Sequence, residues 1–279
     1  MAHTYVLTLT CPDRPGLVYA VTRWIAEAGG NILDSQQFTD TSDGQFFLRV
    51  HFDHPHDLEA LRSSFAPVAQ VHTMDARIVV AEVPTRTLVL VSKEGHCLND
   101  LLYRQSTGAV PIEVPAVVSN HRELERLAAA YDVPFHHVPS DDKAASEARV
   151  LELVDELEVD LVVLARYMQI LSDDLCGALE GRAINIHHSF LPSFKGARPY
   201  HQAHQRGVKL IGATAHYVTA DLDEGPIIEQ GVLRVDHRMT SADLARVGRD
   251  VEAQTLSRAV TLHAESRVLR NGPRTVVLD

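Results

Sequence analysis

The chain has 279 residues, 45% of them hydrophobic and 23% charged, which is ordinary for a globular protein and enough for one large domain or two modest ones. The formal net charge of -11 disfavours a nucleic-acid partner, because phosphate binding requires a basic surface. No apolar run approaches the roughly 18 residues of a membrane span, and the first residues lack the basic region and apolar core of a signal peptide.

Residues 4–83 show the order strand, helix, strand, strand, helix, strand. Alternating side chains mark the strands, apolar residues at helical spacing mark the first helix, and Gly29-Gly30 ends that helix. The predicted strands are 5–9, 31–38, 46–52 and 70–78, and the predicted helices are 17–28 and 55–65. This order in about 80 residues predicts a ferredoxin-like βαββαβ domain.

After a short connector at 84–86 the pattern changes to alternating strands and helices. The strands are unbroken apolar runs, which is typical of a parallel sheet covered by helices on both faces. The predicted strands are 87–91, 116–119, 135–138, 160–165 and 183–186, and the predicted helices are 98–103, 121–131 and 141–157. We therefore expect an α/β protein of two domains, 1–84 and 85–279, with its polar chemistry at the carboxyl ends of the parallel strands.

The segment 183–197 carries the most informative polar side chains of the second domain. Side chains alternate along a strand, so Asn185 and His187 project to the same side where an apolar strand ends. An amide and an imidazole side by side can both donate hydrogen bonds to a carbonyl oxygen. The spacing alone leaves a second interpretation open, in which the pair only caps the turn that follows.

Asn185-Ile-His187 followed by 191–196, together with a second block at 212–230 in which Asp223 precedes a glycine turn, resembles the folate-dependent formyltransferase superfamily. The resemblance implies a Rossmann-like formyltransferase domain with Asn185, His187 and Asp223 as catalytic residues. Cleavage of a formyl amide requires a stabilised oxyanion, an activated water and a protonated leaving nitrogen. Asn185 and His187 can bond the formyl oxygen, His187 can transfer protons, and Asp223 can orient His187 or position the water. This scheme requires no metal and no cofactor.

Five further segments narrow the likeness to the formyltetrahydrofolate deformylase family: 92–104, 118–121, 167–171, 235–237 and 248–252. That resemblance implies hydrolysis of a linear amide bond, which converts 10-formyltetrahydrofolate to tetrahydrofolate and formate. The formate would supply purine synthesis, and the reaction would balance the one-carbon folate pool.

Two alternatives are formyl transfer to an amine and a catalytically idle folate- or amino-acid-binding regulator. Glycinamide ribonucleotide formyltransferases typically have proline at position 188 and a glycine- and serine-rich phosphate loop after the first strand. This chain has His188, and its loop carries Lys93, Glu94 and His96, which disfavours a phosphorylated acceptor. The acidic chain also lacks a basic C-terminal domain for an aminoacyl-tRNA. An idle regulator would have no need of the three retained catalytic residue types.

The folate is expected to lie against the loop 166–171, by similarity to the family. Backbone groups of Met168, Ile170 and Leu171 are the expected contacts for the pterin ring, with apolar side chains covering its faces. The alternative is that these three residues belong to the ordinary core.

Histidines and cysteines are the candidate metal ligands of the chain. The chain has 16 histidines, and His201 and His204 are three residues apart on a predicted helix, but that helix has no acidic residue or cysteine at ligand spacing. The three cysteines are far apart and form no CxxC pair. We therefore expect no metal site, and thiols in a reducing cytoplasm.

The turn 11–16 and Asn31 after the first helix resemble the ACT domain, a module that commonly binds amino acids between paired domains. The resemblance implies an effector site at Asp13, Arg14, Gly16 and Asn31, with the helix N-terminus after Gly16 suited to a carboxylate. Glycine and methionine are the candidate effectors. A purely structural dimerisation domain is the alternative, and a homo-oligomer is expected either way, because pairing would cover an edge of the sheet.

Overall fold

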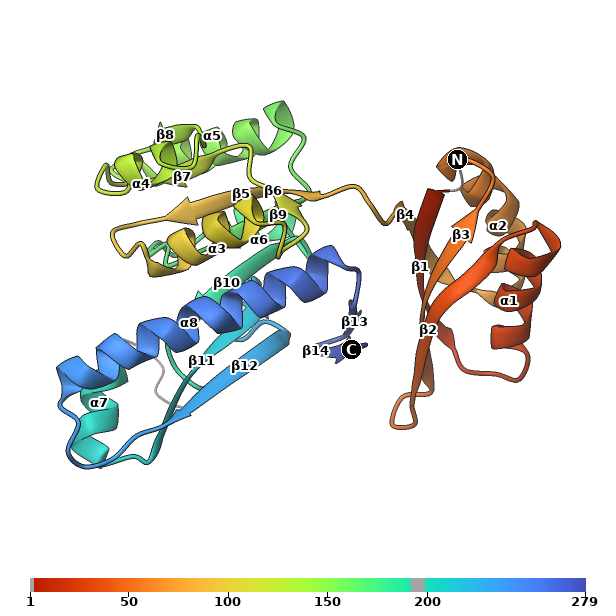
Figure 1. The fold of residues 1–279 in the computed structure, drawn as a ribbon. Coiled ribbons are helices and arrows are strands. Elements are labelled where there is room, and N and C mark those ends of the chain that lie inside the picture. The colour runs from red at the N-terminus through yellow and green to blue at the C-terminus, as the bar shows by residue number, and fades with distance from the viewer. Residues whose placement is uncertain (1–2, 192–198) are drawn as a thin grey trace. The chain divides into compact units, whose positions relative to one another are not determined.

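The computed structural model describes residues 3–191 and 199–279, and the chain divides into two compact units. The first unit comprises Met1–Pro84 with Glu265–Asn271 and Thr275–Asp279, and the second comprises Thr85–Ala264 with Gly272–Arg274 (Figure 1). Within the described ranges, no helix is long and apolar enough to cross a membrane.

The first unit has the predicted βαββαβ order. Its antiparallel sheet has the strand order β2-β3-β1-β4. The elements are β1 (His3–Pro12), α1 (Leu17–Glu27), β2 (Asn31–Asp40), β3 (Gln45–His54), α2 (Leu58–His72) and β4 (Asp75–Val80).

The second helix is longer than predicted, and the strand after it starts later. The Asp57 carboxylate accepts a hydrogen bond from the Ala60 N–H at 2.9 Å, so α2 starts three residues after Pro55. Pro67 suggests a helix end, yet it lies inside α2, which ends only where Thr73 adopts a left-handed conformation with φ 54°. The predicted strand 70–78 is therefore wrong in its first residues.

The two faces of the first sheet pack against different parts of the chain. Side chains alternate along β3, so Leu48 and Val50 join the core beneath α1 and α2 while Phe47 points to the other face. There Phe47 contacts a C-terminal hairpin, β13 (Val268–Asn271) and β14 (Arg274–Val277), through Leu269 and Leu278. The expected boundary placed every residue after 84 in the second domain. The structure instead groups the ends of this hairpin with the first unit.

The second unit contains a mostly parallel sheet with the order β12-β11-β10-β9-β5-β7-β8, and β6 pairs with β5 beside this path. Strands β5, β7, β8, β9 and β10 run parallel, whereas β11 and β12 are antiparallel additions. Its strands are β5 (Thr85–Val91), β6 (Ile112–Glu113), β7 (Val117–Ser119), β8 (Phe135–His137), β9 (Leu161–Leu164), β10 (Ala183–His187), β11 (Leu210–Tyr217) and β12 (Ile227–Arg234).

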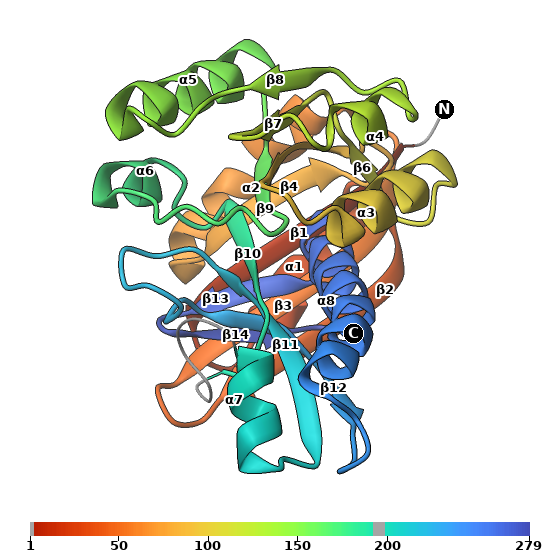
Figure 2. The ribbon, with the colours of Figure 1, turned by 90° about the vertical axis from the view of Figure 1, so that its left-hand side faces the viewer.

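Helices cover both faces of this sheet, as the unbroken apolar strands predict. Helices α5 and α6 lie on one face, and α3 and α8 lie side by side on the other (Figure 2). The helices are α3 (His96–Ser106), α4 (Glu125–Ala129), α5 (Lys143–Glu156), α6 (Asp173–Ala178), α7 (Pro199–Arg206) and α8 (Ser241–Ala264). From β5 the chain continues to β7, the neighbour on one side of β5 in the sheet, and later returns to β9, the neighbour on the other side. The strand order therefore reverses direction between β5 and β9. In open α/β sheets, ligands bind at the carboxyl ends of the strands beside such a point.

Candidate active site

A cavity of about 750 Å³ lies in the second unit, where the carboxyl ends of β5, β9 and β10 meet. The loop after β5 contributes Glu94 and His96, and the segment after β9 contributes 166–171. The far wall comes from residues 185–188, from the connection between β11 and β12, and from one side of α8. The cavity is therefore where the sequence predicts the polar chemistry.

The structure brings Asn185, His187 and Asp223 together in this cavity. Asn185 and His187 lie two residues apart on β10, so both side chains face the same way. The His187 Nδ1 atom lies 3.2 Å from Asp223 Oδ1. The His187 Nε2 atom is buried and has no hydrogen-bond partner among the described residues. A substrate oxygen or nitrogen in the cavity can therefore bond Nε2 while Asp223 holds the opposite edge of the ring.

His216 orients the Asn185 amide, a role that the sequence analysis did not assign. The antiparallel register of β10 and β11 places His216 directly opposite Asn185. His216 Nδ1 lies 2.9 Å from the Tyr217 carbonyl oxygen, which can only accept, so Nδ1 carries the proton. Burial lowers the pKa of His216, which keeps its Nε2 unprotonated and able to accept from Asn185 Nδ2 at 3.2 Å. The second amide N–H of Asn185 therefore points away from His216 and can bond another group.

Asp223 is held by an unusual backbone. Its φ of 58° lies in the left-handed region, which non-glycine residues seldom adopt. Two residues later, a Cβ on Gly225 would lie 1.7 Å from the Tyr217 carbonyl oxygen, so only glycine fits. The hydrogen bond from His187 lowers the pKa of Asp223, although burial acts in the opposite direction, and the carboxylate is ionised at neutral pH.

The three expected folate contacts line the same cavity. The Met168 and Ile170 side chains are 58% and 65% exposed, so they are not ordinary core, whereas Leu171 is half-buried and packs against the core of the unit. The Met168 N–H donates to Ser92 Oγ at 3.0 Å, and its carbonyl accepts from Gln169. Backbone groups of Ile170 and Leu171 have no partner among the residues that the structure describes, and they are free to bond a ligand.

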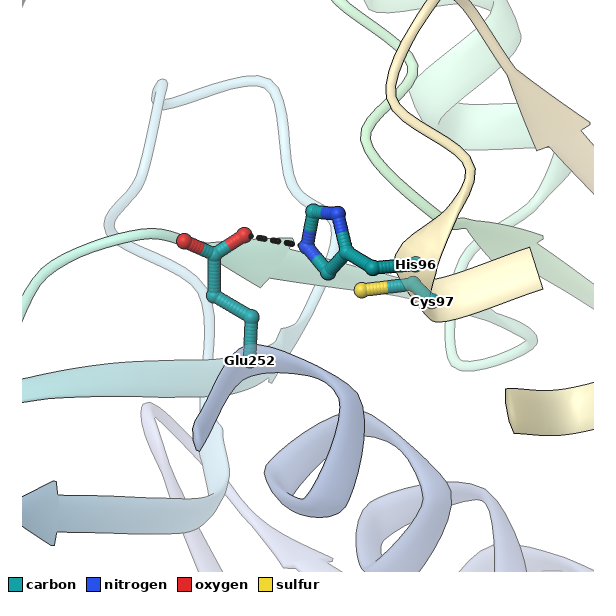
Figure 3. Close-up of side chains that lie close together, drawn as sticks. All are labelled: His96, Cys97 and Glu252. Carbon is teal, nitrogen blue, oxygen red and sulfur yellow. Dashed lines mark hydrogen bonds and ion pairs between the residues drawn. The ribbon is translucent and has the colours of Figure 1, made fainter. Parts of the chain in front are cut away.

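A buried carboxylate on α8 forms a second polar group in the cavity wall. Glu252 is 1% exposed, and its Oε2 lies 2.8 Å from His96 Nε2 (Figure 3) and 3.4 Å from Arg166 Nε. Its Oε1 accepts a hydrogen bond from the Tyr200 hydroxyl at 2.5 Å. Burial raises the pKa of Glu252, but the His96 hydrogen bond, the Arg166 charge and the Tyr200 hydrogen bond outweigh it and the net pKa is lowered.

The sequence contained a signal for Glu252. One face of α8 is buried, and its residues recur at helical spacing: Leu244, Gly248, Glu252, Leu256 and Ala259. Glu252 is the one carboxylate in this otherwise apolar or small-residue stripe. Charged residues on such a stripe are rarely buried without partners. Its partners lie more than 50 residues away in sequence, and spacing does not identify them.

His96, Cys97 and Glu252 also lie close enough to be considered as metal ligands. Their ligand atoms are within 4.8 Å of one another, and Figure 3 shows the His96 ring directed at the Glu252 carboxylate. Both carboxylate oxygens are already hydrogen-bonded, and the neighbouring Arg166 cation disfavours a second cation there. Burial and the Glu252 charge raise the pKa of Cys97 well above its usual range, which disfavours the thiolate that a metal needs. The cluster fits a compensated ion pair better than a metal centre.

His188 lies between the two polar groups. Its ring centroid is 5.1 Å from that of His187 and 6.3 Å from that of Tyr200. Burial, the Arg166 cation and His187 lower its pKa to about 4, against the attraction of the carboxylates of Glu252 and Asp223. His188 is therefore a neutral imidazole at neutral pH.

The expected effector residues belong to the first unit, and all four are exposed. Gly16 has φ 96° and precedes α1, while Arg14 donates to the Val71 carbonyl at 2.8 Å. The turn containing Asp13 follows the end of β1 that pairs with Gln45, whereas Asn31 pairs with Asp53 at the other end of β3. Eight residues of strand separate these ends by roughly 26 Å. One copy of the domain therefore does not bring Asn31 to the 13–16 turn, and a site that uses both requires two copies.

Comparison with known proteins supplies further findings. Residues 85–260 match the formyl transferase family model, and residues 5–63 match the ACT domain model. The chain is 52% identical to the formyltetrahydrofolate deformylase of Corynebacterium sp. (strain P-1), over 98% of both chains, and 47% identical to that of Bacillus subtilis (strain 168), over 98% of this chain and 93% of the relative.

Solved structures agree with this similarity. A formyltetrahydrofolate deformylase from Pseudomonas syringae pv. tomato str. DC3000 superposes with a TM-score of 0.97 at 45% identity, covering 100% of this chain and 95% of the other. Glycinamide ribonucleotide transformylase 1 from Symbiobacterium toebii superposes with a TM-score of 0.66 at 36% identity, covering 70% of this chain and 95% of the other.

Proposed function

The chain belongs to the formyltetrahydrofolate deformylase family, and on that premise we propose that it hydrolyses its substrate in the cavity of the second unit, with Asn185, His187 and Asp223 as the catalytic residues. The enzyme is a hydrolase that converts 10-formyltetrahydrofolate and water into tetrahydrofolate and formate. The observation that carries the site assignment is the contact of His187 with Asp223 beside an Asn185 amide that His216 orients.

Each of the three residues is assigned one role in the proposed hydrolysis, according to its position in the cavity. Asn185 Nδ2 and His187 Nε2 donate to the formyl oxygen and stabilise the oxyanion that forms when water attacks the formyl carbon. Asp223 positions that water with the carboxylate oxygen that His187 does not occupy. The bond from the formyl carbon to N10 then breaks, and the proton lost by the water reaches N10 through His187. Formate and tetrahydrofolate result without a metal or other cofactor.

The folate is proposed to lie against Met168, Ile170 and Leu171. Two exposed apolar side chains and a run of unpartnered backbone groups suit a flat heterocycle with a hydrogen-bonding edge. Because Met168 already uses its N–H and C=O within the protein, the pterin edge is assigned to the backbone of Ile170 and Leu171.

The test is formate release from 10-formyltetrahydrofolate without any acceptor, for the wild type and for Asp223→Asn. We expect the variant to bind tetrahydrofolate normally and to lose about 100-fold or more in kcat, because a neutral amide lacks the charge with which Asp223 holds His187 and orders the water. Asp221→Asn, an exposed neighbour outside the cavity lining, is the matched control and should turn over like the wild type. Rates that survive Asp223→Asn, or that vanish on dialysis against EDTA, would contradict the scheme.

The first unit is proposed to regulate the enzyme. Its ACT match supports binding of an amino acid, with glycine or methionine as candidates at Asp13, Arg14, Gly16 and Asn31. Because one copy holds Asn31 far from the 13–16 turn, a site that uses all four residues would need a second copy, and the proposal includes a homo-oligomer. We further propose a cytoplasmic enzyme whose formate supplies purine synthesis and whose turnover balances the one-carbon folate pool. A change of rate with either amino acid that Asn31→Ala abolishes would support the regulatory role.

A further inference from the structure

The N-terminus of α3 lies at the wall of this cavity, because its first residue, His96, lines the cavity. Helix α3 has 11 residues, starts directly after the loop that follows β5, and has no side chain capping its first N–H groups. Free N–H groups at such a position favour a negative charge, and phosphate groups commonly bind there. A phosphorylated acceptor in this fold would be expected to use it.

In this chain the anion beside that helix is the protein's own Glu252. Its carboxylate bonds His96, the first residue of α3, and lies within 4.8 Å of the Cys97 sulfur, the second residue (Figure 3). The His96 side chain spans the distance between the helix N-terminus and α8. An anion that approaches the start of α3 from the cavity therefore meets an imidazole and a carboxylate.

Several features hold this carboxylate in place. Tyr200 donates to Glu252 Oε1, and Arg166 supplies a compensating positive charge. Gly248 makes room for the Tyr200 hydroxyl, because a Cβ there would lie 2.1 Å from that oxygen. Arg166 adopts φ 66°, a conformation that costs a non-glycine residue energy. The network therefore combines a buried, paired carboxylate with a residue in the left-handed backbone region.

We propose that the network of His96, Glu252, Tyr200 and Arg166 excludes phosphorylated amine acceptors from the cavity and so leaves water as the nucleophile. This inference rests on the proposed function, because the network lines the same cavity as Asn185, His187 and Asp223. Two arginines among the described residues line the cavity, but Arg166 is paired with Glu252 and Arg249 with Glu94. A phosphate would therefore have to compete with these carboxylates and displace the His96 ring.

The network determines which nucleophile reacts, not how the formyl group leaves. With an amine admitted, its nitrogen attacks the formyl carbon, the carbon–N10 bond breaks, and the proton that the amine loses is delivered to N10. The products are an N-formyl amine and tetrahydrofolate. The catalytic residues are the same for both nucleophiles.

The experiment uses O-phosphoethanolamine as a small phosphorylated amine and the full-length double variant His96→Ser with Glu252→Gln. Glutamine still accepts a hydrogen bond from Tyr200, and the Arg166 cation, which loses its carboxylate partner in this variant, becomes available to a phosphate. Formate and N-formyl-phosphoethanolamine are measured together after incubation with 10-formyltetrahydrofolate. We expect only formate from the wild type and from Glu156→Gln, an exposed control on α5, and at least a tenfold higher ratio of N-formyl product to formate from the double variant.

Ethanolamine, which lacks the phosphate, should give no such increase with any variant. The proposal is overturned if the double variant binds tetrahydrofolate and releases formate, yet forms no N-formyl product and is not inhibited by phosphoethanolamine. If the double variant does not fold, Tyr200→Phe removes only the hydroxyl that holds Glu252, and inhibition of its formate release by phosphoethanolamine is then required. A wild type that releases no formate would instead refute the proposed function.

Discussion

Lowering the pH should destabilise the second unit through His188 by an amount that the structure predicts. Its pKa is lowered to about 4, whereas an unfolded histidine titrates near pH 6.5. Between these values the unfolded chain binds more protons than the folded one, so His188 contributes stability that is complete above pH 6.5 and is lost as the pH falls toward 4. From pH 7.5 to pH 5.0 the loss is about 2 kcal/mol for this one group.

The assay is urea unfolding of the wild type and of His188→Gln at both pH values. Trp24 is the single tryptophan and belongs to the first unit, so its fluorescence reports that unit while circular dichroism reports both. Glutamine does not titrate, and His54 and His216, whose pKa values are also lowered by burial, are common to both proteins. We expect the wild type to lose about 2 kcal/mol more than the variant in the second unit. Equal losses would show that His188 titrates normally in the folded protein and would refute this account of its surroundings.

Three further substitutions test other parts of the structure. His216→Phe removes the acceptor that orients Asn185, and we expect kcat to fall by about 10- to 100-fold with little change in KM, as measured by formate release. Ile170→Asp places a charge on the proposed folate surface and should raise KM about tenfold at nearly constant kcat, whereas an unchanged KM would move the folate elsewhere. Leu278→Ala leaves a cavity in the cluster that Leu278 forms with Phe47 and Leu269, and it should lower the free energy of unfolding of the first unit by about 2 kcal/mol, as followed by Trp24 fluorescence. Leu210→Ala, at an exposed position, should lower the free energy of unfolding little.

Most of the fold could be predicted because local patterns and strand order agree. Alternation and helical spacing indicated the βαββαβ order of the first unit, and unbroken apolar strands indicated the parallel sheet of the second. The errors lie at the ends of elements, as in α2, which continues beyond residue 65 through Pro67 to His72. The position of the C-terminal hairpin was not predictable, because Leu269 meets Phe47 more than 200 residues away and no local pattern reports such a contact.

The site was predictable to the extent that strand geometry determines it. Asn185 and His187 had to share a side of β10, and the resemblance supplied Asp223 as their partner. The role of His216 required the β10–β11 register, which alternation alone does not give. The partners of Glu252 required the packing of α8 against α3, and the tautomer of His216 required the position of one carbonyl oxygen.

His188, which lies between the two polar groups of the cavity, is uncharged at neutral pH. Each group contains one carboxylate with a lowered pKa, Asp223 in one and Glu252 in the other, so both are ionised at neutral pH. A cation at His188 would attract both and compete with His187 for Asp223 and with Arg166 for Glu252. Burial disfavours that cation and leaves Asp223 paired with His187. Substituting lysine for His188 should therefore impair hydrolysis, measured as formate release, because an ammonium group ionises more readily than an imidazole and would draw Asp223 away from His187.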